Sequence, residues 1–142
     1  MPLPESIHLE IVTPEQRLVS EIVDEVVLPG SEGSLGVLPG HTPLLTTLGI
    51  GELVYRRGGV KRYVAIAWGF AEVLPDRVAV LAEIAERAEG IDRERAARAR
   101  DRAMKRLREG ASETDFKRAQ VALQKAIVRI QVGHGTGPNE PS

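Results

Sequence analysis

The sequence predicts an N-terminal all-β sandwich or barrel of about ten short strands, followed by a C-terminal antiparallel α-helical hairpin. Seven of the nine prolines and nine of the fourteen glycines lie before residue 76, whereas neither residue type occurs between residues 91 and 109. Frequent glycine and proline are typical of short strands joined by turns, and a long stretch without them favours helix. We therefore expect a sandwich over residues 1–87, a helical hairpin over 88–132 and a flexible tail over 133–142.

Alternating side chains and turn residues predict the strands. Ile7, Leu9 and Ile11 recur at every second position, which indicates a strand with one buried face. Gly58-Gly59, between two apolar runs, can adopt the positive φ angles of a two-residue hairpin turn. Pro75-Asp76-Arg77 is a further turn between strands. The other runs expected to form strands cover residues 18–19, 22–28, 35–38, 52–57, 60–67, 68–74 and 78–83.

Capping residues delimit two helices in the second part of the chain. Asp92 can accept backbone N–H bonds at the start of the first helix and favours the positive end of its dipole. Gly110 ends that helix, and Ser112 followed by Asp115 resembles a capping box. The helices should pair through a thin, alanine-rich interface that buries little apolar area. We therefore expect the helical hairpin to be stabilised by packing on a further surface. The predicted apolar stripes are Ala96, Ala99, Ala103 and Leu107, then Phe116, Ala119, Leu123, Ala126, Ile127 and Ile130.

The composition excludes several classes of protein. Without cysteine there is no disulfide, thiolate nucleophile, iron–sulfur cluster or cysteine-based zinc site. No stretch approaches 18 consecutive apolar residues, and the N-terminus lacks the basic-then-apolar order of a signal peptide. We expect a protein that stays in the compartment where it is made and reaches a membrane only through a partner.

The net charge of −1 conceals two opposed blocks. Residues 1–90 hold 7 basic and 13 acidic side chains, whereas residues 91–132 hold 12 basic and 6 acidic ones. Seven arginines and one lysine fall within residues 93–108, and guanidinium groups suit carboxylate and phosphate recognition. A solvated helix face with neighbouring opposite charges is the alternative interpretation. Since a helical hairpin with a thin apolar interface must gain stability from docking, an acidic protein partner is expected for the basic helix.

Side chains suited to catalysis are few. His8, His41 and His134 lack the close spacing of a helical metal pair, and we interpret them as structural. Residues 30–36 are glycine-rich, but no Gly-Lys-Ser/Thr follows as in a phosphate loop. Trp68 is expected in the sandwich core. We predict no catalytic residue and no metal site, and two alternatives stay open: a free-standing nucleic-acid-binding module built on the basic helix, and a small hydrolase or isomerase.

Several segments resemble the epsilon subunit of F-type ATP synthases. The run VLPGSEGSLGVLPGHTPLLT at residues 27–46 closely resembles the hallmark of that family, and WGFAEV at 68–73 is similar to its later sandwich strand. Ile91-Asp92 with Arg95-Ala96 fits its I-D-x-x-R-A pattern at the start of the helical hairpin. Residues 114–130 resemble the second helix, so the resemblance covers about residues 6–132.

This resemblance implies a non-catalytic central-stalk subunit of a proton-driven ATP synthase, peripheral on the cytoplasmic face of a bacterial plasma membrane. In the family, the sandwich sits against the gamma subunit and the c-ring. The helical hairpin folds down on the sandwich or extends toward the alpha and beta subunits, where it inhibits ATP hydrolysis. By analogy, a loop carrying Glu32, Ser34 and His41 would face the c-ring and gamma. Arginines of the basic helix that would meet an acidic segment of beta are Arg98, Arg106 and Arg108.

The resemblance also implies ATP as a candidate regulatory ligand, since some family members bind it at the helical hairpin, where it favours the folded-down state. We expect no required cofactor. Asp92 and Arg95 occupy positions of the family motif, and Glu86 and Arg102 fall at consistent spacings. Without nucleotide, Asp92 as an N-cap and Arg95 as a surface residue would explain both positions equally well.

Overall fold

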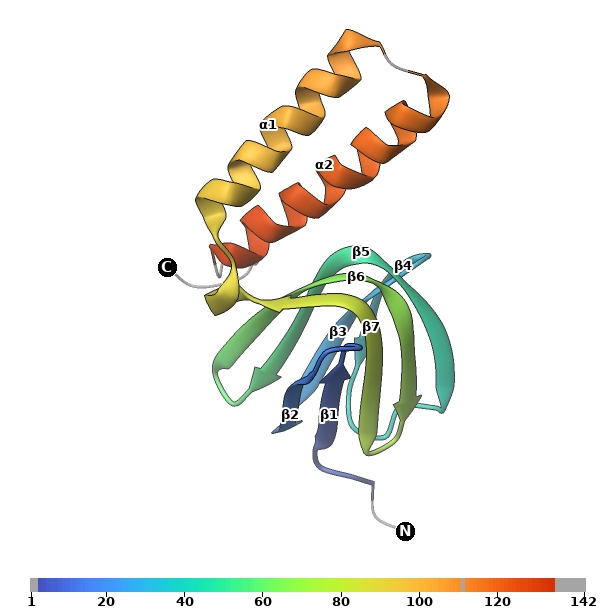
Figure 1. Ribbon diagram of the computed structural model, residues 1–142. Helices are drawn as coiled ribbons and strands as arrows, with labels where there is room; N and C mark the ends of the chain where they lie inside the picture. Colours follow the sequence, from blue (N-terminus) through green and yellow to red (C-terminus); the bar gives the residue numbers. More distant parts are fainter. Residues whose placement is uncertain (1–2, 111, 135–142) are drawn as a thin grey trace.

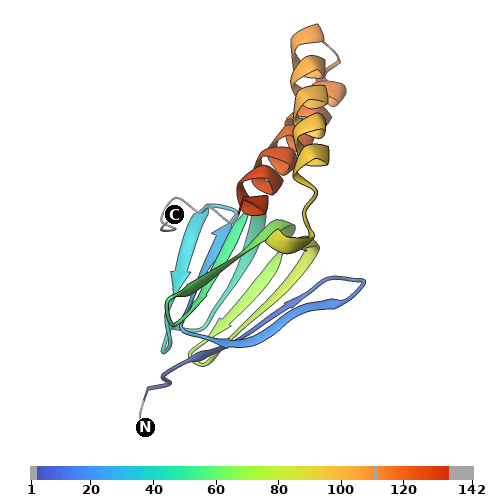
Figure 2. The same cartoon turned by 90° about the vertical axis from the view of Figure 1, so that its left-hand side faces the viewer.

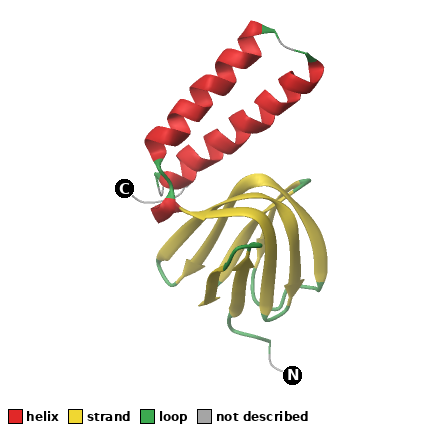
Figure 3. Ribbon diagram, viewed as in Figure 1, coloured by secondary structure: helices red, strands yellow, loops and turns green. Residues whose placement is uncertain are grey.

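Seven strands and two α-helices follow one another in the computed structural model, which describes residues 3–110 and 112–134 (Figures 1 and 3). The predicted order of a β-sandwich and then a helical hairpin is confirmed. The elements are β1 Ile7–Val12, β2 Arg17–Val23, β3 Glu25–Gly30, β4 Gly33–Val37, β5 Leu44–Arg57, β6 Val60–Leu74, β7 Arg77–Arg87, the 3-10 turn η1 Ala88–Gly90, α1 Arg93–Glu109 and α2 Glu113–Gly133. The expected tail lies outside the described residues, except that Gly133 ends α2 and His134 caps it.

The strands form one sheet in the order β2-β1-β7-β6-β5-β3-β4. β1 and β7 run parallel, and the other neighbouring pairs are antiparallel. The sheet curls over so that its parts enclose one apolar core, to which every strand contributes (Figures 1 and 2). Ile7, Leu9 and Ile11 are fully buried in that core, as their alternation predicts.

The strands are fewer and longer than predicted, because β5 and β6 extend over 14 and 15 residues. Residues 60–67 and 68–74 belong to one strand that changes faces at Trp68. Before it, Val64 and Ile66 face the core, and after it Ala71 and Val73 do, so the buried positions change from even to odd. Such a change interrupts the period-two pattern, which is why the sequence suggested two strands there.

The change of faces occurs at the same level in three strands. Gly49, Trp68 and Glu83 are skipped in the pairing, while the register on either side of this row is unchanged. Trp68 has a φ of 59° and Gly69 a φ of 141°. A residue with a side chain rarely adopts such values, so Gly69 supplies the backbone freedom that turns the strand over. We call the row Gly49–Trp68–Glu83 the corner row.

Trp68 is half-buried beside this corner and does not lie in the core, so the core prediction was wrong. Its left-handed backbone turns the indole away from the position that the alternation of β6 would give it. The ring lies under the ammonium of Lys125 on α2, 4.4 Å from the ring centroid. This tryptophan therefore contacts the helical hairpin.

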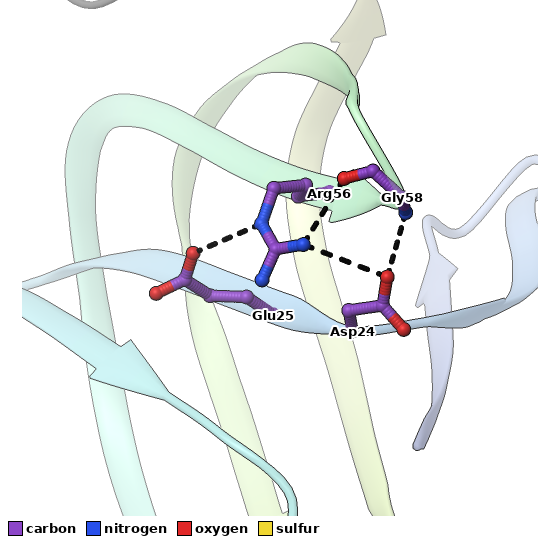
Figure 4. Close-up of polar contacts among 4 residues, drawn as sticks. All are labelled: Asp24, Glu25, Arg56 and Gly58. Carbon is purple, nitrogen blue, oxygen red and sulfur yellow. Dashed lines mark hydrogen bonds and ion pairs between the residues drawn. The ribbon is translucent and has the colours of Figure 1, made fainter. Parts of the chain in front are cut away.

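A polar cluster ties the start of β3 to the turn between β5 and β6 (Figure 4). The Gly58 N–H donates to the Asp24 carboxylate at 2.6 Å, and Arg56 Nη1 donates to the Gly58 carbonyl at 3.0 Å. Arg56 also pairs with Asp24 at 3.6 Å and Glu25 at 3.5 Å. Gly58 has a φ of 60°, as the predicted glycine turn requires.

The two helices are capped as predicted and meet through alanine. The Asp92 carboxylate accepts from the Arg95 N–H at 3.1 Å, and the Ser112 hydroxyl accepts from the Asp115 N–H at 3.3 Å. Gly110 ends α1 in the left-handed region with a φ of 68°. The helical residues that become fully buried are Ala96, Ala103, Ala119, Ala126 and Val132. Phe116 and Ile127 of the predicted stripe are instead 40% and 39% exposed, so the fully buried part of the stripe is narrower than predicted.

The helical hairpin rests on the sandwich through the C-terminal part of α2, and its tip points away (Figures 1 and 2). Val128 and Val132 pack on Tyr63 and Ala65 of β6. This small second cluster is the surface that the thin alanine interface was expected to need.

Gly69→Ala should strongly destabilise the sandwich. A Cβ at this position would meet the carbonyl oxygen of Leu81, and alanine at a φ of 141° is strained. We expect a loss of about 3 kcal/mol or more in the free energy of unfolding, measured by urea denaturation. Gly59→Ala is the matched control, since a Cβ there meets nothing within 4 Å. Equal stability of the two variants would contradict this account of the corner.

Candidate functional site

The four predicted nucleotide-binding residues line one pocket between β7, the linker and the two helices. The pocket has a volume of about 360 Å³. Glu86 lies near the end of β7, Asp92 precedes α1, and Arg95 and Arg102 are seven residues apart, which places them on one face of α1. The complete lining is Glu86, Gly90, Ile91, Asp92, Arg95, Ala96, Ala99, Arg102 and Arg129.

The electrostatics of this pocket favour an anion. Arg129 Nε donates to the Glu86 carboxylate at 2.7 Å, and Asp92 caps α1. Within the described part of the chain, neither Arg95 nor Arg102 has a carboxylate within ion-pair distance of its side chain. Two unneutralised guanidinium groups thus line the pocket, Arg95 in the first turn of α1, near the positive end of the helix dipole, and Arg102 two turns farther along the same face. Ile91, Ala96 and Ala99 add an apolar wall.

Arg129 was absent from the predicted set, although a signal for it exists in the sequence. It stands between Val128 and Val132 on the side of α2 that docks on the sandwich. A charged residue between apolar positions on a docked helix face indicates a partner of opposite charge on the surface opposite it, here Glu86. Without the fold, that partner could not be identified.

The structure does not bring Glu32, Ser34 and His41 together. Glu32 lies in the turn between β3 and β4, and Ser34 follows near the start of β4. His41 comes four residues after the end of β4, where the neighbouring Gly40 N–H donates to the Pro75 carbonyl at 2.7 Å. The expected contact loop is thus two turns at opposite ends of a strand.

Arg98, Arg106 and Arg108 are exposed on α1, and the last two lie in its final turn. Cations there are stabilised by the negative end of the helix dipole. Among ion pairs within residues 3–110 and 112–134, a single one joins an α-helix to a strand, Arg129 with Glu86. In this arrangement the basic face of α1 is therefore not neutralised by the acidic sandwich.

The remaining titratable groups do not form a second site of this kind. His8 Nε2 lies 3.2 Å from the Ser20 hydroxyl and 3.9 Å from the Glu10 carboxylate. Both contacts involve the same ring nitrogen, so histidine cannot relay a proton between them as in a catalytic triad. Burial raises the pKa of the Glu52 carboxyl, and burial together with the hydrogen bond to Glu21 raises the pKa of Tyr55. No group of three potential metal ligands occurs among the described residues.

Both parts of the chain match models of known families. Residues 6–88 match the β-sandwich domain of ATP synthase delta/epsilon chains, and residues 89–133 match the long α-helix domain of the same chains. A sandwich that carries a helical hairpin in this order is thus of the delta/epsilon type.

Relatives with curated names narrow the assignment from the delta/epsilon type to the epsilon chain. The ATP synthase epsilon chain of Syntrophobacter fumaroxidans is 54% identical over 132 residues, which cover 93% of this chain and 98% of the relative. Those of Nitratidesulfovibrio vulgaris and Herpetosiphon aurantiacus are each 52% identical, over 89% of this chain and over 95% and 93% of their own lengths. The chain belongs to the epsilon-subunit family of F-type ATP synthases.

Solved structures agree with this assignment. A chain of the Euglena gracilis mitochondrial ATP synthase, in a structure of OSCP, F1 and c-ring, aligns with a TM-score of 0.78 and 27% identity, over 87% of this chain and 79% of the other. A chain of the Tetrahymena thermophila central stalk and c-ring shares the fold, with a TM-score of 0.52, 13% identity and coverage of 95% and 98%. As a member of the epsilon-subunit family of ATP synthases, this chain belongs to a membrane-associated complex. None of its described helices is long and apolar enough to span a membrane.

Proposed function

We propose that this epsilon subunit is a non-catalytic rotor component that couples the gamma subunit to the c-ring and restrains ATP hydrolysis through its helical hairpin. The observation that carries the proposal is the attachment of the hairpin by one end of α2, with the basic helix α1 exposed. The sandwich has its own core and can stay bound to one partner. The helical hairpin is attached to it only by one end of α2 and can therefore bind a second partner in one position and release it in another. The complex makes ATP from ADP and phosphate with a proton gradient, at the cytoplasmic face of a bacterial plasma membrane.

Exposed leucines mark the surface proposed to face gamma and the c-ring. Leu38 and Leu45 are 55% and 71% exposed, and they flank His41 in the sequence. Large apolar side chains with this much exposure are candidates for protein–protein contacts. The turn with Glu32 and Ser34 adds polar groups at the other end of β4, and the rotor contacts are proposed to involve both ends.

Immobilised gamma subunit should capture this chain, and Leu45→Glu should weaken capture about tenfold because a carboxylate would be desolvated in the contact. Val60→Glu is the matched control, since Val60 is an exposed apolar residue (54%) at the β5–β6 turn. Failure of the unaltered chain to bind gamma would overturn the rotor proposal, and equal loss in both variants would remove Leu45 from the interface.

The inhibitory partner of α1 is proposed to be an acidic segment of the beta subunit, with the alpha and beta subunits enclosing the extended arm. Arg98, Arg106 and Arg108 are exposed and have no carboxylate within ion-pair distance among the described residues. Their fork-shaped guanidinium groups can pair with carboxylates in a bidentate manner. An arm bound in this way would resist rotation in the hydrolysis direction.

Removing residues 90–142 should leave the sandwich folded and raise the ATPase rate of the assembled complex, because the inhibitory arm is lost. The sandwich core contains no helical residue, so the truncated chain should keep its thermal transition. The triple variant Arg98→Ala, Arg106→Ala, Arg108→Ala should raise the rate as well, whereas Lys117→Ala on α2 should not. A rate that is unchanged or lower after truncation would count against inhibition by the hairpin.

We also propose that the pocket binds ATP, which would stabilise the arrangement described here. Its volume lies within the range of small-molecule sites. Arg95 and Arg102 would take the phosphates together with Arg129, while Ile91 and the two alanines would contact the base. Glu86 and Asp92 offer acceptors for hydroxyl or amino groups. The site joins β7 to both helices, so a ligand there favours the docked hairpin.

Titrating ATP into the isolated chain should show saturable binding that Arg95→Ala and Arg102→Ala each weaken about tenfold or more, because each removes a charged hydrogen bond. Arg108→Ala is the control for net charge. Asp92→Asn keeps the helix cap and removes the carboxylate charge, so it separates the two roles of Asp92. Equal binding by Arg95→Ala and the unaltered chain would remove Arg95 from the site.

A further inference from the structure

The contact between α2 and the sandwich combines three kinds of interaction on one helix face. Lys125 lies over Trp68, Arg129 pairs with Glu86, and Val128 and Val132 pack on β6. Each of these positions lies three or four residues from two others, so they form a single stripe on the helix. Arg129 and the valines would suit any strand with a carboxylate and small apolar neighbours. The Lys125 contact instead requires an aromatic ring at one place.

Trp68 holds that place through an unusual backbone. Its φ of 59° lies in the left-handed region, which a bulky aromatic residue rarely occupies. Trp68 belongs to the corner row and has no pairing partner in β5 or β7. The sheet therefore constrains the indole less than it constrains a paired residue, and the ammonium of Lys125 lies over the ring.

The same ring takes part in a second feature of the surface. Trp68 lines a largely apolar pocket of about 540 Å³, together with Pro14, Phe70 and Leu81. Phe70 and Leu81 are each more than half exposed. A single side chain thus connects the docked helix to the shape of a pocket on the sandwich.

We propose that Trp68 and Lys125 form a latch that holds the helical hairpin on the sandwich, and that opening it changes the pocket beside Trp68. When α2 leaves, the indole loses the cation that fixes its orientation and becomes more accessible. The latch acts between parts of one chain and needs neither nucleotide nor another subunit. A test that overturns the latch would therefore not argue against the proposed rotor function or the proposed ATP site.

The full-length chain offers a direct test, because it has one tryptophan and no cysteine. Arg57→Cys and Gln120→Cys, both exposed positions, would carry a donor and an acceptor dye that report the separation of β5 from α2. Quenching of tryptophan fluorescence by acrylamide in the unlabelled chain reports access to Trp68. Both are measured without nucleotide.

Lys125→Met keeps the aliphatic stem and removes the charge. We expect the ratio of undocked to docked molecules to rise about three- to tenfold, with stronger acrylamide quenching. Lys105→Met on α1 removes the same charge away from the tryptophan and should change neither signal. Trp68→Leu should open the hairpin to a similar extent, and the double variant no further than either single one.

Two results would overturn the latch. One is an unchanged energy transfer and quenching in Lys125→Met. The other is a double variant whose opening equals the sum of the free-energy changes of Lys125→Met and Trp68→Leu. Such additivity would show that the two side chains act independently of each other. Since Lys125 lies at the helix surface, its replacement tests the proposal even if the Trp68 variant fails to fold.

Discussion

The exchange of faces at the corner row is the constraint on which the rest of the structure depends. Three neighbouring strands must turn over at one level for a single sheet to enclose its own core, and Gly69 makes this possible because a side chain there would collide with β7. In the part of β6 before the corner, the outer side of the strand carries Tyr63 and Ala65 and receives α2. The docking surface of the helices is thus a product of the same backbone turn that closes the sandwich.

The helical hairpin is held by few contacts of different physical character. Apolar packing by Val128 and Val132 is insensitive to salt, whereas the pair of Arg129 with Glu86 weakens as ionic strength rises. The pocket proposed to bind ATP shares Glu86 and Arg129 with this attachment. A ligand in the pocket would therefore contact the residues that hold the helical hairpin on the sandwich. Ligand binding and hairpin position would then be coupled directly, with no intermediate residues needed.

The sequence allowed the order of domains, the glycine turns, both helix caps and the alanine interface to be predicted, since each depends on local chemistry. Asp92 and Ser112, for example, act on amide groups three residues away. Trp68 was misplaced because its orientation follows from a backbone angle that no alternation pattern reveals. Arg129 was missed because its partner is 43 residues away in sequence. The resemblance to a family grouped Glu86 and Arg102 with Asp92 and Arg95. Helical spacing could relate Arg95 to Arg102, but it could not place Glu86, which lies on β7 outside the helix.

The alanine interface leaves the helical hairpin with little internal apolar packing. Ala96 and Ala103 are seven residues apart, and so are Ala119 and Ala126, so the fully buried positions repeat every two turns of both helices. Small side chains at these positions let the helices lie close together, but they bury little apolar area per turn. The stability of the helical hairpin therefore depends on the surface that receives it as much as on the contact between its own two helices.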